Sequence, residues 1–135
     1  MEINRADVVA EVTEVFHRYE TALVTNNVDT LDALFWSSEL TVRLGASENL
    51  FGQDEILAFR KARPSSGLNR KLERVVITTF GENFATTNAV FTRDGWPTDK
   101  YGRQSQSLVK FHDLGWQIVS AHVSIIDTAD QNMDR

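Results

Sequence analysis

The order of the periodic segments is the feature that most constrains the fold. In the first part of the chain, apolar residues recur at helical spacing, with charged residues between them: Val8, Val12, Val15, Tyr19, Ala22 and Leu23. In the second part, four segments are rich in β-branched and aromatic residues: 71–80, 84–93, 103–111 and 116–125. Helices followed by a meander of strands are typical of an α+β fold.

Two more helices and a small hairpin are expected between these two parts. A short helix begins at Asn27 or Asp29, where an N-cap residue precedes an apolar pattern. Segment 40–44 is strand-like and segment 50–52 returns after a turn, which predicts a hairpin. A third helix, 53–63, has acidic residues in its first turn and basic residues in its last, as the helix dipole favours.

A single domain is expected, because 135 residues of which 41% are hydrophobic suffice for one core. We assign residues 1–126 to this domain and the polar segment 127–135 to a C-terminal tail. The predicted sheet is a four-stranded antiparallel one with one apolar face, which would curl around the N-terminal helices as a cone. The space between helices and sheet is the natural binding pocket.

Composition and motifs exclude several classes of function. The chain has no cysteine, so disulfides and thiolate catalysis are ruled out. Its formal charge of −5 disfavours nucleic acid and acidic membranes as partners. The first residues lack the pattern of a signal peptide and no apolar run could span a membrane, so a cytoplasmic protein is expected. We find no phosphate loop, no dinucleotide fingerprint and no histidine ligand spacing, so no cofactor and no metal ion are expected.

Arginines within the sheet-forming and helical segments are the first candidates for a site. Arg43 is out of phase with the apolar residues of segment 40–44. Arg60 and Arg63 share one face of the third helix, and Arg103 opens a strand. Arginine presents a planar fork of donors that fits carboxylate or phosphate, so their convergence would create an anion site. The alternative is that they are surface residues paired with the many acidic side chains.

Tyr19 is the second candidate, because it lies on the apolar stripe of the first helix. One interpretation is a core tyrosine whose hydroxyl bonds to backbone. The other is a general acid or base, since a nearby guanidinium favours the phenolate and lowers the pKa of a phenol. Tyr19 and Arg43 in one cavity would meet that condition.

Polar residues of the last two strands complete the candidate set. His122 alternates with Trp116 and Ile118, which would place it at the mouth of the cone as a structural or substrate-binding residue. Ser105, close to Arg103, is a further candidate for substrate binding. No acidic residue nearby on the last strand completes a catalytic triad.

Three amide side chains, those of Asn88, Gln104 and Gln106, admit two interpretations. They would add neutral polar contacts to a ligand, or they would lie on solvated sheet surface.

Several segments resemble the AtzH-like family, whose members are related to proteins of oxalurate catabolism, within the nuclear-transport-factor-2-like (SnoaL-like) superfamily. The resemblance extends from the first helix to Ser124 and rests on these segments: "LDALFW", "TVRLGASENLFGQDEILAFRKARP", "VVITTFGENFATTN", "GRQSQSLVKF" and "GWQIVSAHVS". It implies a cone-shaped α+β fold and a pocket in which a helix tyrosine and a strand arginine are needed for activity. These two match Tyr19, in its "RYE" context, and Arg43, in "TVRLG".

The activity that the resemblance implies is the decarboxylating amide hydrolysis of 1,3-dicarboxyurea to allophanate, a step in cyanuric acid breakdown. Relatives in other nitrogen-compound pathways occur beside an amidase-signature enzyme, so an association with such an enzyme is a second expectation. A small substrate with two carboxylates would need local arginines in a chain of net negative charge. The alternatives are an isomerase or cyclase, which would use a carboxylate base, and a non-catalytic binding or assembly partner of the amidase.

A homodimer is also expected, because the sheet face that is not packed on helices would be exposed to solvent in a monomer. Phe91, Val109 and Phe111 are the expected contact residues.

Overall fold

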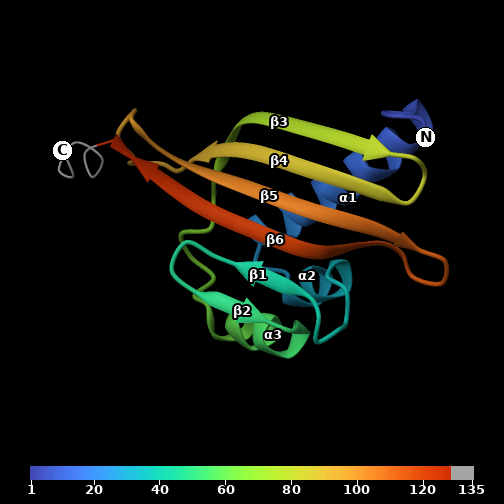
Figure 1. Cartoon of the computed structure of the whole chain (residues 1–135). Coiled ribbons are helices and arrows are strands. Elements are labelled where there is room, and N and C mark those ends of the chain that lie inside the picture. The colour runs from blue at the N-terminus through green and yellow to red at the C-terminus, as the bar shows by residue number, and fades with distance from the viewer. Residues whose placement is uncertain (129–135) are drawn as a thin grey trace.

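A computed structural model describes residues 1–128 of the chain (Figure 1). Within these residues it contains three helices and one six-stranded sheet of order β2-β1-β6-β5-β4-β3. The helices are α1 (Ala6–Val24), α2 (Val28–Leu34) and α3 (Gln53–Ala62). The strands are β1 (Val42–Leu44), β2 (Asn49–Phe51), β3 (Lys71–Phe80), β4 (Phe84–Thr92), β5 (Lys100–Phe111) and β6 (Gly115–Asp127).

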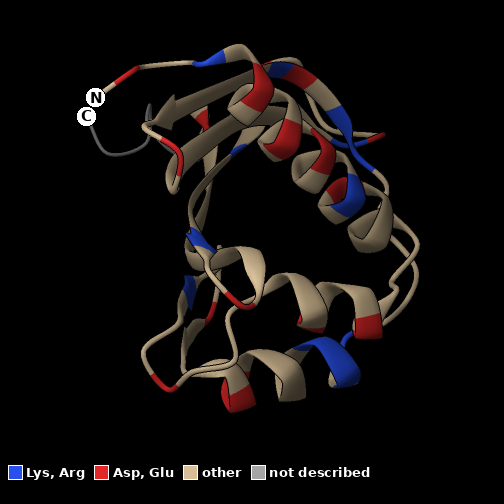
Figure 2. Ribbon diagram, turned by 90° about the vertical axis from the view of Figure 1, so that its right-hand side faces the viewer, with Lys and Arg blue, Asp and Glu red and all other residues tan. Residues whose placement is uncertain are grey.

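The predicted α+β order is confirmed, and the apolar stripe of α1 forms the centre of the core. All six stripe residues, from Val8 to Leu23, are buried. Figure 1 shows α1 behind the strands β3 to β6, while α2 and α3 lie beside β1 and β2. In Figure 2 the helices lie on one side of the sheet, which curves around them. Asn27 caps α2 as expected, its side-chain oxygen accepting a hydrogen bond from the Thr30 backbone N–H at 3.2 Å.

The sheet has two more strands than the four that were predicted. The expected meander from β3 to β6 is present and antiparallel, but the β1–β2 hairpin joins it through parallel pairing of β1 with β6. The cause lies just after α2, where Phe35 bridges to Ile118 and the Trp36 N–H donates to the Ile118 carbonyl at 3.0 Å. These contacts place the chain that follows α2, including β1, next to β6. Pairing between such distant segments has no local sequence signal.

A bulge in β6 changes which of its side chains face the helices. Leu108 pairs with Ile118, whereas the preceding Ser107 pairs with Ser120, so Val119 has no partner of its own on β5. One extra residue on one strand reverses the alternation of side chains beyond it.

The reversal corrects the predicted faces of the last strand. Trp116 and Ile118 are buried under the helices, but beyond the bulge Ala121 takes the inward position and His122 is exposed. The simple period of two predicted His122 on the same face as Trp116, and that prediction is wrong.

One of the three expected dimer residues lies inside the domain. Phe91 is 1% exposed, and its ring lies over Gly102, where a Cβ atom would come within 2.1 Å of the ring. Phe91 therefore cannot contribute to an outer contact. Val109 and Phe111 are partly buried, and Phe111 stacks on Trp36 with 5.2 Å between ring centroids. A dimer through the outer face of the sheet stays a prediction.

β6 continues through Asp127, one residue beyond the expected end of the domain, while positions 129–135 of the expected tail lie outside the described residues. Among residues 1–128, none of the helices combines the length and the apolar character that crossing a membrane requires.

Candidate functional site

Arg43 enters the interior because of the strand to which it belongs. It pairs with Ala121 of β6, which also faces inward, and it is 6% exposed. Its neighbours Val42 and Leu44 take the opposite face, as the alternation in the sequence predicted. Arg43 donates from Nη1 to Glu48 Oε1 at 2.9 Å. Gly45 permits this contact, because a Cβ atom there would lie 1.7 Å from the same oxygen.

Arg60 and Arg63 reach the same region from the C-terminal end of α3. Arg60 is 1% exposed, and its guanidinium lies 4.9 Å from the centre of the Phe35 ring. The ring of Phe59 is shared by two guanidinium groups, with Arg43 at 5.5 Å and Arg63 at 5.9 Å. The aromatic faces partly replace the hydration that these cations lose.

Most of the nitrogens in this arginine cluster, defined as Arg43, Arg60 and Arg63, have no hydrogen-bond partner among the described residues. The unpaired buried atoms are Nε, Nη1 and Nη2 of Arg60, Nε and Nη2 of Arg63 and Nε of Arg43. A buried charged donor without a partner is costly, and folded proteins rarely retain one. The cluster therefore has the hydrogen-bonding capacity of an unfilled anion site.

Tyr19 faces the cluster from α1 and is 1% exposed. Burial by itself would raise the pKa of its phenol, but the positive charges of Arg60, then Arg43 and Arg70, outweigh burial and lower this pKa below its ordinary value. Tyr19 and Arg43 are therefore close enough to interact electrostatically, while their meeting in one cavity stays a prediction. A phenol with a lowered pKa is a better proton donor near neutral pH.

A second polar group, made of Arg70, Glu20 and Gln104, borders the cluster. Arg70 and Glu20 were not predicted from the sequence. Arg70, in the segment before β3, forms an ion pair with Glu20 of α1 and donates to Gln104 Oε1 at 2.9 Å. Its guanidinium also lies 4.4 Å from the centre of the Phe91 ring. Arg70 and Glu20 had no sequence signal, because Arg70 follows a loop and Glu20 is one of many charged residues of α1.

Three of the predicted substrate-binding residues lie on the other side of the sheet. Arg103, Ser105 and His122 are exposed. Arg103 donates to Ser124 at 3.2 Å, and Ser105 donates to Asn88 at 2.6 Å. On β5 the buried positions are Gly102, Gln104, Gln106 and Leu108, so the alternate residues must face outward. The expectation that these three residues contact a ligand in the cone is wrong.

The charges around Tyr19 leave the site positive. Arg43 is paired with Glu48 and Arg70 with Glu20, but within residues 1–128 no carboxylate lies within ion-pair distance of Arg60 or Arg63. Burial, followed by the charges of Arg60 and Arg43, lowers the pKa of Arg63 to about 10. Two uncompensated cations favour a ligand that carries two negative charges.

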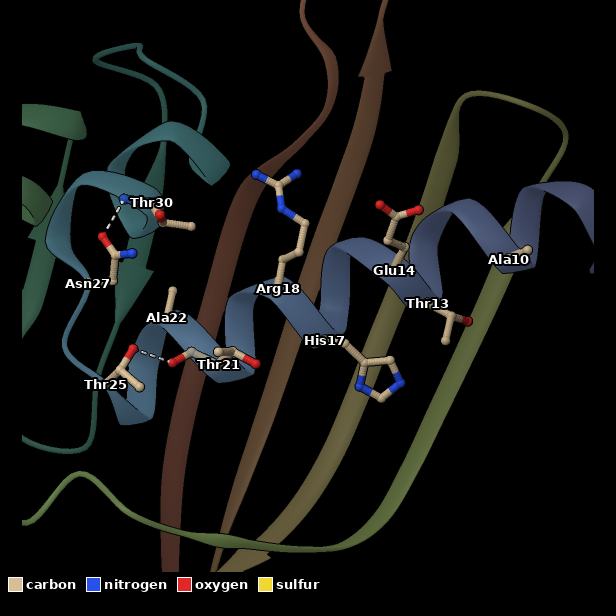
Figure 3. Close-up of a pocket in the computed structure, with 10 residues that line it drawn as sticks. All are labelled: Ala10, Thr13, Glu14, His17, Arg18, Thr21, Ala22, Thr25, Asn27 and Thr30. Carbon is tan, nitrogen blue, oxygen red and sulfur yellow. Dashed lines mark hydrogen bonds between the residues drawn. The ribbon is translucent and has the colours of Figure 1, made fainter.

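A hollow on the surface along α1 is not part of this site. It has a volume of about 720 Å³ and lies along the solvent-facing side of α1 and the start of α2 (Figure 3). Its side chains, among them Glu14, His17 and Arg18, are mostly exposed, and none belongs to the arginine cluster. Over residues 1–128 we find no group of three His, Asp or Glu side chains placed to hold a metal ion.

The AtzH-like family matches the chain over residues 1–129, nearly its whole length. The chain belongs to the AtzH-like family. No curated protein matches it.

Solved structures of relatives agree with this assignment. A protein of unknown function from Pectobacterium atrosepticum is 54% identical, with 93% of this chain and 95% of the other covered and a TM-score of 0.89. A cystatin-like fold protein from Burkholderia xenovorans is 44% identical, with 93% and 97% covered and a TM-score of 0.87. An NTF2-like superfamily protein from Salmonella enterica is 25% identical, with 88% and 91% covered and a TM-score of 0.72. The fold is therefore that of the NTF2-like superfamily.

The lowered pKa of Tyr19 can be measured directly. The difference in absorbance at 295 nm between the wild type and Tyr19→Phe isolates the ionisation of this phenol, and its midpoint should lie below the value of about 10 for a free phenol. A bound dianion such as malonate should move the midpoint upward, because its charge offsets the arginines. A midpoint at or above 10 without ligand would contradict the electrostatic argument.

Proposed function

We propose that this protein is a cofactor-free decarboxylating amidohydrolase that acts on a small urea or amide bearing two carboxylates, with 1,3-dicarboxyurea as the representative substrate. The observation that carries the proposal is the group of buried, unpaired guanidinium nitrogens of Arg60 and Arg63 beside Tyr19. A dianion of this kind supplies the missing acceptors and the missing charge in one molecule.

Substrate binding follows from the geometry of the arginine cluster. Arg60 and Arg63 bind one carboxylate, since their free nitrogens have no acceptor within residues 1–128. Arg43 contacts the adjacent carbonyl through its free Nε, while its Nη1 stays on Glu48. Guanidinium groups on a carbonyl oxygen stabilise negative charge that develops there during C–N cleavage.

The chemical step requires one proton. The bond between the terminal carboxyl carbon and the urea nitrogen breaks, carbon dioxide leaves, and the electron pair stays on nitrogen. Tyr19 gives its proton to that nitrogen, which yields the monoanion allophanate, and water returns a proton to the phenolate. The substrate dianion and one proton thus become a monoanion and carbon dioxide, so atoms and charges balance.

The carboxylates near the site support this reaction over an isomerase. An isomerase of this fold would need an aspartate or glutamate base in an apolar pocket. Glu48 is bound to Arg43 and Glu20 to Arg70. Burial alone would raise the pKa of Glu48, but its bonds with Ser47 and Arg43 lower it below the ordinary value. A carboxylate held in this way is a weak base.

The proposal is tested by incubating the purified protein with 1,3-dicarboxyurea, oxalurate and related ureas. Release of carbon dioxide measures the proposed step, and release of ammonia measures cleavage of a terminal amide. Carbon dioxide release from the dicarboxylated urea above the uncatalysed rate supports the proposal. Rates equal to the uncatalysed ones for all these compounds would contradict it.

Tyr19→Phe keeps the buried ring and removes the proton. Turnover should fall by roughly two to four decades, because general acid catalysis contributes about this much. The melting temperature should stay close to that of the wild type, and Tyr101→Phe, on strand β5 and outside the arginine cluster, serves as the matched control. An active and well-folded Tyr19→Phe protein would refute the role of this residue.

Arg43→Lys keeps the positive charge but loses the fork of donors. It should raise KM and lower kcat, because lysine can replace the pairing with Glu48 but not the additional contact through Nε. Arg103→Lys is the matched control, since Arg103 is exposed on the other face of the sheet. Equal kinetics for the Arg43→Lys and Arg103→Lys proteins would count against the assignment.

A further inference from the structure

We propose that Gln104 and Gln106 form a second, neutral half of the site, in which their amide groups donate to the urea or amide carbonyl oxygen of the ligand and share that oxygen with Arg43 Nε. This inference rests on the proposed function and deepens it. The ligand class it defines is a short, linear carboxylate with a urea or amide group at the distance of these glutamines from the arginine cluster.

The orientation of Gln104 is fixed by chemistry. Its side chain is on a residue only 2% exposed, and its Oε1 accepts from Arg70 Nη2 at 2.9 Å. A guanidinium has donors and no acceptor, so the oxygen of the amide must be the atom that faces Arg70. The Nε2 group is consequently the one left free, and it is buried with no partner in the part of the chain that the structure describes. An amide held in this way presents two N–H donors to the interior.

Gln106 repeats the arrangement two residues further along β5. It is also 2% exposed, and its Oε1 accepts from the hydroxyl of Thr87 at 3.1 Å. Its Nε2 is buried and finds no acceptor anywhere in residues 1–128. Residues two apart on a strand share one face, so both free amide groups lie on the helix-covered side of the sheet. The Thr87 hydroxyl can donate or accept, so one end of the Gln106 amide, Nε2 in this orientation, is left without a partner in residues 1–128. Two buried amides that each retain an unpaired group indicate a common partner that is not part of the chain.

The register of the sheet places these donors opposite Arg43. Gln106 pairs with Ala121 of β6, and Ala121 pairs with Arg43 of β1. All three residues are buried and face inward, and the side chain between the two polar ends, that of Ala121, is a single methyl group. Neighbouring strands are about 4.8 Å apart, so the Cα atoms at the two ends of this row are about 10 Å apart. A ligand of about ten heavy atoms, such as 1,3-dicarboxyurea, is long enough to contact both ends.

The two ends of the row differ in charge, and that difference defines the ligand. The arginine cluster has uncompensated positive charge and suits a carboxylate. The two glutamines are neutral donors and suit the oxygen of an uncharged carbonyl. A site built to donate to a carbonyl discriminates against an analogue that lacks it, because its buried donors then stay unpaired.

Calorimetric titration with two stable probes tests the inference. N-carbamoylglycine carries a carboxylate and a urea group, and 4-methylpentanoate has the same shape with the urea replaced by hydrocarbon. The wild type should bind N-carbamoylglycine more tightly. In Gln104→Leu and Gln106→Leu this preference should shrink about tenfold, as expected when a buried amide donor is lost. Gln117→Leu is the matched control, because Gln117 bonds to backbone on β6 outside this row.

A second variant covers the case in which a leucine protein fails to fold. Gln104→Glu keeps the shape and the contact with Arg70 but replaces the free donor by an acceptor, so it should also reduce the preference. An unchanged preference in the folded variants overturns the inference, as does a wild type that binds neither probe or binds both equally. Loss of the preference without turnover of 1,3-dicarboxyurea would contradict the proposed reaction and leave this binding role in place.

Discussion

The burial of Arg60 is the constraint on which the rest of the structure depends. A guanidinium that is 1% exposed, beside the Tyr19 hydroxyl and with no carboxylate or carbonyl acceptor for its three nitrogens within residues 1–128, opposes folding unless something else compensates it. Contact with the Phe35 ring at 4.9 Å offsets part of this cost, and burial shifts the pKa of Arg60 downward. The remaining cost is understandable if the cluster exists to bind an anion, because such sites often retain local instability for function.

The fold brings the site together through two features of the sheet edge. Parallel pairing of β1 with β6 carries Arg43 inward opposite Ala121, and the bulge at Val119 turns Ala121 toward the helices and His122 away from them. If Val119 were paired regularly, the alternation that starts at Trp116 would turn Ser120 and His122 toward the helices in place of Ala121. Helix α3 then places its basic C-terminal turn over this edge, so that cations from two elements meet Tyr19 of α1.

Local sequence patterns predicted the helices and strands and the inward orientation of Tyr19 and Arg43. They did not predict which other residues lie beside these two. The stripe of α1 and the alternation around Arg43 fix which way Tyr19 and Arg43 face, and both follow from spacing alone. Arg103, Ser105 and His122 were misplaced because their faces depend on strand register and on the bulge, which arise from pairing between distant segments. Arg70, Gln104 and Gln106 become meaningful only through tertiary contacts, so a sequence pattern shows them as ordinary polar residues.

The most direct test of this account is the free energy of unfolding of Arg60→Met, measured by urea denaturation in buffer without multivalent anions and again with malonate. Methionine fills a similar volume without charge, so the variant should be as stable as the wild type or about 1–4 kcal/mol more stable in the anion-free buffer. Malonate should raise the stability of the wild type and leave that of the variant unchanged. A variant that is less stable by 2 kcal/mol or more without anions, or that malonate stabilises as much as the wild type, would show that Arg60 supports the fold rather than a ligand.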